Sequence, residues 1–322
     1  MTPELWGVII SGSILLTVII LFNLFLNLVQ VIWFARRMDF SKGFKYFTAE
    51  DFGLEKETFV FDSLSKIKVN GYIYRIKLET YKGIVVLAHG MGPGHLAYTT
   101  EINYFAQNGF IVYAYDIPGT GNSTNKHIGS MEEAIATLEG LLEYLKNETL
   151  KVSLYGHSWG GYAVLNVNKK YHLHAVAALA PVRNFFYGVV GSKSILNFVY
   201  VPFITLFKYA KYYKIDTVKT ISKTRTKTAI FYSRNDPSVR FLDNINPFYK
   251  LNNHLISLIE RNKPTHRINL SDEGLKYDNK FNEDLRTIKD EKTREEYLKN
   301  VDWSLMTELD ENLMSKILRF YE

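Results

Sequence analysis

A serine between two glycines is the residue best placed to do chemistry in this sequence. Gly156-His157-Ser158-Trp159-Gly160 fits the pattern G-x-S-x-G, between the strand-like run KVSLY and the helix-like run GYAVLNVNKK. A strained strand-to-helix turn projects a serine hydroxyl, and glycines leave room for such a turn. The N-terminus of the following helix also favours negative charge that develops beside it. The pattern therefore predicts that Ser158 is a nucleophile.

A second loop with the same kind of chemistry follows an earlier strand-like run. His89-Gly90-Met91-Gly92 comes directly after GIVVLA. Backbone N–H groups of such a loop and of the residue after the nucleophile can stabilise an oxyanion. We expect Met91 and Trp159 to supply these two N–H groups. The alternative is that the glycines only let the chain reverse its direction.

The elements that must position these residues follow a regular order. From about Glu57 onward, short β-branched runs alternate with amphipathic stretches, which predicts a mainly parallel sheet flanked by helices. ETFVFDS and VNGYIYRIKL predict an antiparallel hairpin, and SMEEAIATLEGLLEYLKN and DENLMSKILRFYE predict helices. Six nearly continuous apolar runs predict buried strands: GIVVLAHG, FIVYAYD, KVSLYGHS, AVAALAPV, TAIFYSRND and HRINLSD.

Four motifs carry a resemblance to a known family. HGMGPGH, YDIPGTGNS, GHSWGGYA and FYSRNDPSV, in this order, resemble motifs of bacterial α/β-hydrolases of the serine-aminopeptidase-like and esterase/lipase type. The resemblance covers roughly residues 57–322. It implies the α/β-hydrolase fold, with a mainly parallel eight-stranded sheet and a helical cap at about 183–222. It also implies a catalytic acid after the strand that follows the cap, where Asp236 stands, although Asp before Pro237 could simply cap a turn.

The catalytic base is the part of the pattern that this sequence does not match. The resemblance implies a Gly-His pair on the loop after the last strand, and with HRINLSD as that strand the pair reads Gly274-Leu275. Leucine cannot transfer a proton, so Leu275 would leave the triad incomplete. If HLISLIE were the last strand instead, His266 would lie on the following loop and could be the base. His95 is a weaker substitute, and His254 is expected on the helix before the last strand.

The N-terminal segment predicts a membrane anchor. No residue between Glu4 and Arg36 is charged, and this run exceeds the ~20 apolar residues that cross a bilayer. A cleaved signal peptide would begin with basic residues and have a shorter apolar core. We therefore expect an anchor over residues 1–38, a juxtamembrane linker over 39–56 and a hydrolase domain over 57–322.

Charge on the two sides of the anchor predicts its orientation. Arg36, Arg37 and Lys42 follow the apolar run, and the positive-inside rule then places the body in the cytoplasm of a single-pass cell-membrane protein. Three polar residues share one helical face, which favours self-association or a partner helix unless water reaches this interfacial end: Asn23, Asn27 and Gln30.

The amino-acid composition limits the kinds of ligand and cofactor that this chain is expected to bind. The chain has no cysteine, which excludes a thiol nucleophile, and its net charge of +6 is spread among acids rather than gathered in a nucleic-acid-binding stripe. No metal or organic cofactor is implied. Ten aromatic residues in the expected cap suit a lipid-like small molecule, unless they only pack the cap onto the body: Phe185, Phe186, Tyr187, Phe198, Tyr200, Phe203, Phe207, Tyr209, Tyr212 and Tyr213.

Two functions fit these observations. The first is a membrane-anchored serine hydrolase that cleaves an acyl-ester or lipid-like substrate through Ser158. The second is a catalytically silent relative that binds a ligand or a protein in the same pocket, which the missing histidine favours. The elbow, the oxyanion loop and Asp236 occur together, so we expect the first.

Overall fold

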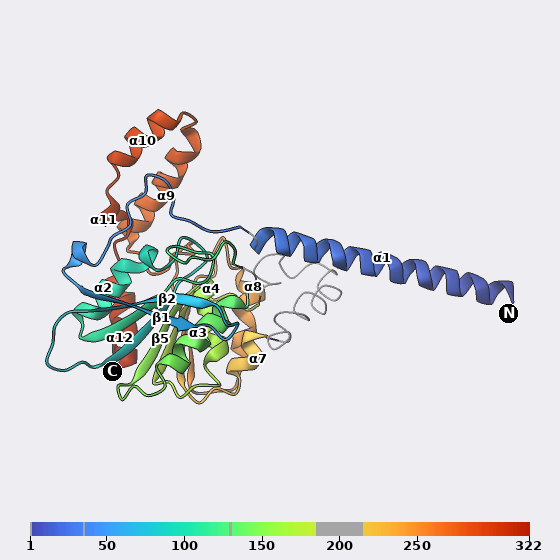
Figure 1. The fold of residues 1–322 in the computed structure, drawn as a ribbon, viewed down its shortest axis with the longest axis horizontal. Coiled ribbons are helices and arrows are strands. Elements are labelled where there is room, and N and C mark those ends of the chain that lie inside the picture. Colours follow the sequence, from blue (N-terminus) through green and yellow to red (C-terminus); the bar gives the residue numbers. More distant parts are fainter. Residues whose placement is uncertain (1, 35, 129–130, 185–214) are drawn as a thin grey trace.

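The computed structural model describes the chain except residues 1, 35, 129–130 and 185–214 (Figure 1). The expected cap and its ten aromatic residues fall in the last of these gaps, apart from the cap's two ends, and lie outside the described residues. Ser130, the first residue of the expected helix SMEEAIATLEGLLEYLKN, is also outside them. Side chains of residues 23 and 26–34 are not described either, so the polar face of the first helix stays a prediction.

One eight-stranded sheet organises the body. Its strand order is β1-β2-β4-β3-β5-β6-β7-β8, with β2 antiparallel to both β1 and β4 and every other pair parallel. The strands are β1 Glu55–Asp62, β2 Lys68–Arg75, β3 Gly83–Ala88, β4 Phe110–Tyr115, β5 Val152–His157, β6 Ala175–Leu179, β7 Lys227–Tyr232 and β8 Ile256–Glu260. The expected hairpin and the expected number of strands are both confirmed.

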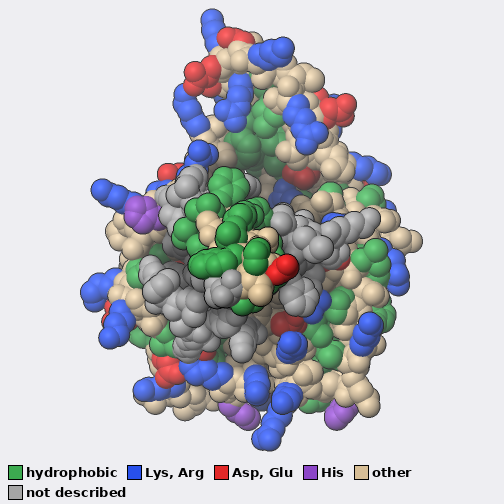
Figure 2. Space-filling view, turned by 90° about the vertical axis from the view of Figure 1, so that its right-hand side faces the viewer, with side chains coloured by type: hydrophobic (Ala, Val, Ile, Leu, Met, Phe, Trp, Pro, Cys, Tyr) green, Lys and Arg blue, Asp and Glu red, His purple; other side chains and the backbone are tan. Residues whose placement is uncertain are grey.

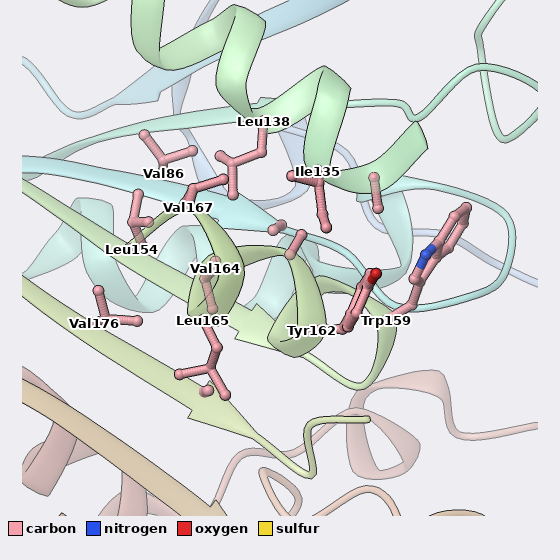
Figure 3. Close-up of a cluster of buried hydrophobic side chains, with 14 of the residues drawn as sticks. Val86, Ile135, Leu138, Leu154, Trp159, Tyr162, Val164, Leu165, Val167 and Val176 are labelled. Atoms are coloured by element: carbon pink, nitrogen blue, oxygen red, sulfur yellow. The ribbon is translucent and has the colours of Figure 1, made fainter. Parts of the chain in front are cut away.

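Helices cover both faces of this sheet. The described helices of the body are η1 Glu50–Phe52, η2 His95–Tyr98, α2 Thr99–Gln107, α3 Glu133–Tyr144, α4 Trp159–Val167, α7 Thr217–Ile221, α8 Phe241–Asn244, η4 Asn246–Lys250 and α12 Glu311–Tyr321. Side chains of α3 and α4 meet one face of the sheet, where Ile135, Leu138 and Leu165 are buried among strand residues (Figure 3). Side chains of α2 and α12 fill the other face.

Three helices form an extension that stands clear of the sheet. They are α9 Asp272–Thr287, α10 Glu291–Lys299 and α11 Trp303–Met306 (Figure 1). Their apolar side chains form a small cluster of their own around Phe281 and Leu298, and Phe44 from the N-terminal part of the chain packs against it. The extension therefore has its own core rather than sharing that of the sheet.

The position of the last strand corrects the sequence prediction. HRINLSD was expected to be this strand, but β8 lies inside HLISLIE and pairs with β7. Ile268 and Leu270 are 0% and 1% exposed, so the alternation in HRINLSD comes from a buried loop. Arg261 holds this loop in a curve, because its Nη1 donates to the carbonyl oxygen of Ile268 at 2.6 Å.

The prediction that Leu275 occupies the place of the catalytic histidine is consequently wrong. Ser271 caps α9, and its Oγ accepts a hydrogen bond from the backbone N–H of Gly274 at 2.8 Å. Leu275 follows in the first turn of the helix, where its side chain is buried. His254 also differs from expectation, since it lies in a turn before β8 and not on a helix.

The N-terminal helix extends away from the body as a long rod (Figure 1). This helix, α1, runs over Pro3–Phe34, and Pro3–Phe22 is long and apolar enough to cross a membrane or to act as a signal sequence. Figure 2 views the molecule from the N-terminal end of α1, so the exposed hydrophobic side chains of this helix stand at the centre of the view, with Lys and Arg scattered around the edge of the molecule.

Candidate active site

Ser158 sits on a strained turn between β5 and α4. Its backbone angles are φ 54° and ψ −112°, which a residue with a Cβ adopts only when its surroundings impose them. The N–H of Ser158 donates to the carbonyl oxygen of Leu179 at 2.8 Å, and its own carbonyl oxygen accepts from the N–H of Tyr162 at 3.0 Å. The neighbouring strand and the first turn of α4 thus hold the predicted elbow.

The glycines of the elbow are needed for close backbone packing. A Cβ on Gly160 would lie 1.9 Å from the carbonyl oxygen of Ala88 in β3, and a Cβ on Gly156 would lie 2.5 Å from the carbonyl oxygen of Gly160. Either contact is shorter than the packing distance of any carbon and oxygen. The spacing of the motif therefore follows from the approach of α4 to β3.

Asp236 and His266 form a hydrogen-bonded pair near this serine. His266 Nδ1 lies 2.8 Å from Asp236 Oδ2. The other carboxylate oxygen, Oδ1, accepts from the backbone N–H groups of Ser238 at 2.7 Å and Val239 at 2.8 Å. An ionised carboxylate only accepts, so a neutral His266 carries its proton on Nδ1 and keeps a lone pair on Nε2. That is the tautomer a general base needs.

His266 reaches this place because β8 ends earlier than the sequence suggested. It lies on the loop between β8 and α9, as the alternative register required, and its side chain is 21% exposed whereas that of Asp236 is 2% exposed. Ser158 and His266 line the same cavity, which has a volume of about 380 Å³. The structure thus brings together the serine, the histidine and, through the histidine, the aspartate.

His157 links three loops of the site and was missed as a functional residue. Its Nε2 lies 2.9 Å from the carbonyl oxygen of His266, and its Nδ1 lies 2.8 Å from Tyr98 Oη. The N–H of Gly90 donates to the same Tyr98 Oη at 2.9 Å. A carbonyl oxygen only accepts, so Nε2 of His157 donates and Nδ1 accepts the Tyr98 hydroxyl proton.

This arrangement requires a neutral His157. Burial lowers the pKa of His157 to about 3, and the neighbouring His266 acts in the same direction. The ring therefore keeps one proton at neutral pH, and each of its nitrogens has one defined partner. The oxyanion loop, the elbow and the loop of His266 are joined in one chain of hydrogen bonds.

His95 is not placed to act as the substitute base. Its ring is fully buried, with Nδ1 2.8 Å from Asp116 Oδ1 and Nε2 2.8 Å from Tyr74 Oη. Burial opposes the charge of Asp116, but the attraction of His95 and its hydrogen bonds outweigh it and lower the pKa of the carboxyl. Asp116 Oδ1 also accepts from the backbone N–H of His95 at 2.8 Å. The pair ties the loop after β3 to the loop after β4.

The two expected oxyanion donors lie at the correct places in the fold. Met91 follows β3, lines the cavity and is 40% exposed, and Trp159 is the first residue of α4. The indole of Trp159 is buried, and its Nε1 donates to the carbonyl oxygen of Met131 at 2.8 Å (Figure 3). Their roles as donors remain predictions.

A buried carboxyl in the cavity wall also escaped the sequence analysis. Glu101 is 2% exposed, and its Oε1 accepts from Nδ2 of Asn269 at 2.7 Å. Burial raises the pKa of this carboxyl, although its hydrogen bonds act in the opposite direction. Asn269 is on the same loop as His266, which is already attached to His157. The contact with Glu101 therefore attaches this loop to α2 as well.

In the described part of the chain, no group of three or more metal-binding side chains comes together.

The fold and the site define a class of protein. A mainly parallel eight-stranded sheet with a serine elbow after β5, an acid after β7 and a histidine after β8 is an α/β-hydrolase. A family model described as "Serine aminopeptidase, S33" matches residues 79–251, more than half of the chain. The chain belongs to this family.

Individual relatives cover less of the chain. "Phospholipase YtpA" of Bacillus subtilis is 31% identical over 91 residues, 28% of this chain and 35% of that protein. "Abhydrolase domain-containing protein abhd-5.2" of Caenorhabditis elegans is 33% identical over 90 residues, 27% of this chain and 20% of that protein. The chain therefore spans about a third or less of the length of these curated relatives.

The solved structures support the fold. The esterase Pf2001 of Pyrococcus furiosus superposes with a TM-score of 0.54 at 17% identity, covering 72% of this chain and 91% of the esterase. At that identity the likeness establishes the architecture and not the substrate.

Proposed function

We propose that this protein is a membrane-anchored hydrolase of acyl esters, with Ser158 as nucleophile, His266 as base and Asp236 as the acid that orients the base. The observation that carries the proposal is the 2.8 Å contact between His266 Nδ1 and Asp236 Oδ2, on a histidine that lines one cavity with Ser158. This pair supplies the base that the sequence had left in doubt.

The reaction would follow the acyl-transfer scheme. Oγ of Ser158 attacks the ester carbonyl carbon while its proton moves to Nε2 of His266, and Asp236 stabilises the imidazolium. The backbone N–H groups of Met91 and Trp159 are proposed to hold the oxyanion. The imidazolium then gives its proton to the leaving alkoxide, and water hydrolyses the acyl-enzyme with His266 again acting as base.

A lipid-like ester is the substrate class that suits the cavity and the anchor. The aromatic and apolar residues Phe44, Phe47 and Leu96 line the cavity beside the serine. Phe44 follows Phe34, where α1 ends, by ten residues, and at 3.3–3.6 Å per residue the cavity wall lies within roughly 35 Å of that end. One partial relative is named a phospholipase, which agrees with this class.

The alternative of a catalytically silent relative has lost its main support. It rested on Leu275 in the position of the base, whereas Leu275 lies on α9 and His266 contacts the acid. We therefore propose only the hydrolase.

Labelling by a fluorophosphonate probe tests the proposal. We expect rapid labelling of the full-length protein in detergent, complete loss in Ser158→Ala, and a decrease of about 10²-fold or more in rate in His266→Ala. Ser153→Ala, a serine in the same strand that precedes the elbow, is the matched control and should label normally. A folded wild type that does not label would overturn the assignment.

Membrane attachment and orientation need a separate measurement. We propose that α1 spans the cell membrane with the body in the cytoplasm, because the basic residues Arg36 and Arg37 follow the helix. The protein should remain in the membrane pellet after alkaline carbonate extraction, and a tag after Glu322 should resist external protease in intact cells. Release by carbonate would contradict the anchor, and digestion of the tag would reverse the topology.

A further inference from the structure

The segment that joins α1 to the body is bound along its length rather than extended as a free linker. We call residues 37–47 the strap. At its start, the N–H of Met38 donates to the carbonyl oxygen of Gly119 at 2.9 Å, and Nη1 of Arg37 donates to the carbonyl oxygens of Ser123 at 2.6 Å and Asn125 at 2.8 Å. These contacts fix the start of the strap on the loop after β4.

The middle of the strap packs on the helical extension. The ring of Phe44 lies 5.4 Å from the rings of Phe281 and Trp303, measured between centroids, and completes the apolar cluster of the extension. Lys42 Nζ lies 2.5 Å from Glu291 Oε1 on α10. Figure 1 shows the chain after α1 crossing the body and passing beside the extension before it turns down to the sheet.

The end of the strap is hydrogen-bonded to the start of α2, which follows the loop that contains Met91. Oγ1 of Thr99 donates to the carbonyl oxygen of Phe47 at 2.8 Å, and the ring of Phe47 lies 5.4 Å from that of Phe52. Phe47 and Phe44 both line the cavity that contains Ser158. From the extension, α11 adds Trp303 and Met306 to the same wall.

We propose that the strap and α11 together form the acyl-chain-binding wall of the active site, so that the segment leading from α1 determines which acyl chains are accepted. This inference rests on the proposed function, because it assigns part of the substrate to one wall of the same cavity. An acyl chain fits this wall because Phe44, Phe47 and Trp303 line it with aromatic rings. Ser41 and Lys45 of the strap also line the cavity, and Lys45 Nζ lies 3.5 Å from Asp51 Oδ1.

The geometry also shows how the wall can be displaced without changing any side chain that lines it. Gly43 has φ +80°, and a Cβ there would lie 2.7 Å from Cδ1 of Leu298, a buried residue of the extension's cluster. A branched side chain at this position strains the backbone of the strap and requires the strap or the Leu298 side chain to shift. Gly43→Val is therefore a test of the strap as an element.

The experiment compares hydrolysis of p-nitrophenyl octanoate and p-nitrophenyl acetate by the full-length protein in detergent. The readout is the ratio of the two kcat/KM values, in which the leaving group is constant and only the acyl chain differs. We expect the ratio to fall about tenfold in Phe47→Ala and in Trp303→Ala, as for lost contacts in an apolar pocket, and to fall in Gly43→Val as well. The ratio should fall less in Phe47→Leu than in Phe47→Ala, because leucine keeps part of the apolar contact.

Tyr144→Ala is the matched control. Tyr144 is a half-exposed aromatic residue on α3 that stacks on Phe59 and is not among the residues that line the cavity, so its loss should leave the ratio unchanged. Labelling of Ser158 by the fluorophosphonate probe verifies that each variant is folded. An unchanged ratio in labelled Phe47→Ala and Trp303→Ala would overturn the acyl-chain-binding wall and would leave the proposed function standing. A folded wild type that neither labels nor hydrolyses either ester would overturn the proposed function, and the strap assignment with it.

Discussion

The carbonyl oxygen of His266 lies 2.9 Å from Nε2 of His157, the residue that directly precedes the nucleophile. The loop that carries the base is therefore hydrogen-bonded to the elbow that carries Ser158. Their relative position does not depend on the contact between the two reacting side chains. Positioning of this kind matters because a displacement of about 1 Å can reduce a rate by about 10².

The hydrogen-bond chain through His157 predicts coupled effects. His157→Phe removes the contacts with His266 and Tyr98, and Tyr98→Phe removes those with His157 and Gly90. We expect each variant to lower kcat for p-nitrophenyl acetate about tenfold, and the double variant to lose less than the product of the two. A coupling free energy of about 0.5–3 kcal/mol from the double-mutant cycle would confirm the chain. Strictly additive effects would show that the two residues act independently.

Replacing Asp236 by asparagine should lower kcat strongly while leaving the fold intact. In Asp236→Asn, the side-chain amide can donate to His266 Nδ1 and so favours the tautomer with its proton on Nε2, which cannot accept the proton of Ser158. We expect kcat to fall by about 10⁴. Asp290→Asn, an exposed helix cap on α10, is the control and should keep its rate. A loss below tenfold would assign the acid elsewhere.

Stability should fall in mild acid because His157 is buried in its neutral form. Its pKa is about 3 in the folded chain and its ordinary value is 6.5, so the unfolded chain binds a proton between these pH values that the folded chain does not. The free energy of unfolding therefore decreases as the pH falls from 6.5 toward 3, with a limiting slope of about 1.4 kcal/mol per pH unit for this group.

Urea denaturation at pH 7 and pH 5 checks this slope. The loss of stability between the two pH values should be smaller in His157→Phe than in the wild type, by about 1–2 kcal/mol. His172→Phe removes a histidine near the surface and serves as the control. An equal loss in the wild type and in His157→Phe would mean that other groups cause the pH dependence.

A histidine at position 275 should not restore or improve activity. Leu275 is buried in the first turn of α9, so an imidazole there would lose its hydrogen bonds to water without a partner arranged to replace them. We expect Leu275→His to lower the free energy of unfolding by about 1–3 kcal/mol and to leave ester hydrolysis no faster than in the wild type. Leu275→Met provides a volume-matched control. A rise in kcat in Leu275→His would show that this position does reach the serine.

Local patterns in the sequence predicted the sheet and the elbow well. The turn at Ser158 follows a motif of five consecutive residues, and close backbone contacts require glycine at positions 156 and 160 of that motif. The apolar runs of β3 to β7 are buried on both faces, which made them visible as strands. The loop motif that contains Met91 was located for the same reason.

The preferred last strand, and with it the expected position of the base at Leu275, was wrong because a buried segment at the end of the sheet is not a strand, whereas His266 came from the alternative strand. β8 is an edge strand whose residues are half-buried or exposed, so its pattern is weak. The loop after it buries Ile268 and Leu270 and imitates a strand. The partners of the strap could not be predicted either, because Phe44 packs on residues of α9 and α11 that no local pattern connects to it.

The packing of Phe44 against Phe281 and Trp303 has a consequence for the order in which the active site is completed during synthesis. A ribosome delivers the chain from the N-terminus, so α1 and the strap emerge long before the extension exists. Until residues 281 and 303 have emerged, Phe44 has no apolar cluster to join, and one wall of the cavity is missing. His266 also emerges in this late part of the chain. With α1 as the proposed anchor, the nascent protein would be attached to the membrane before its active site could accept a substrate.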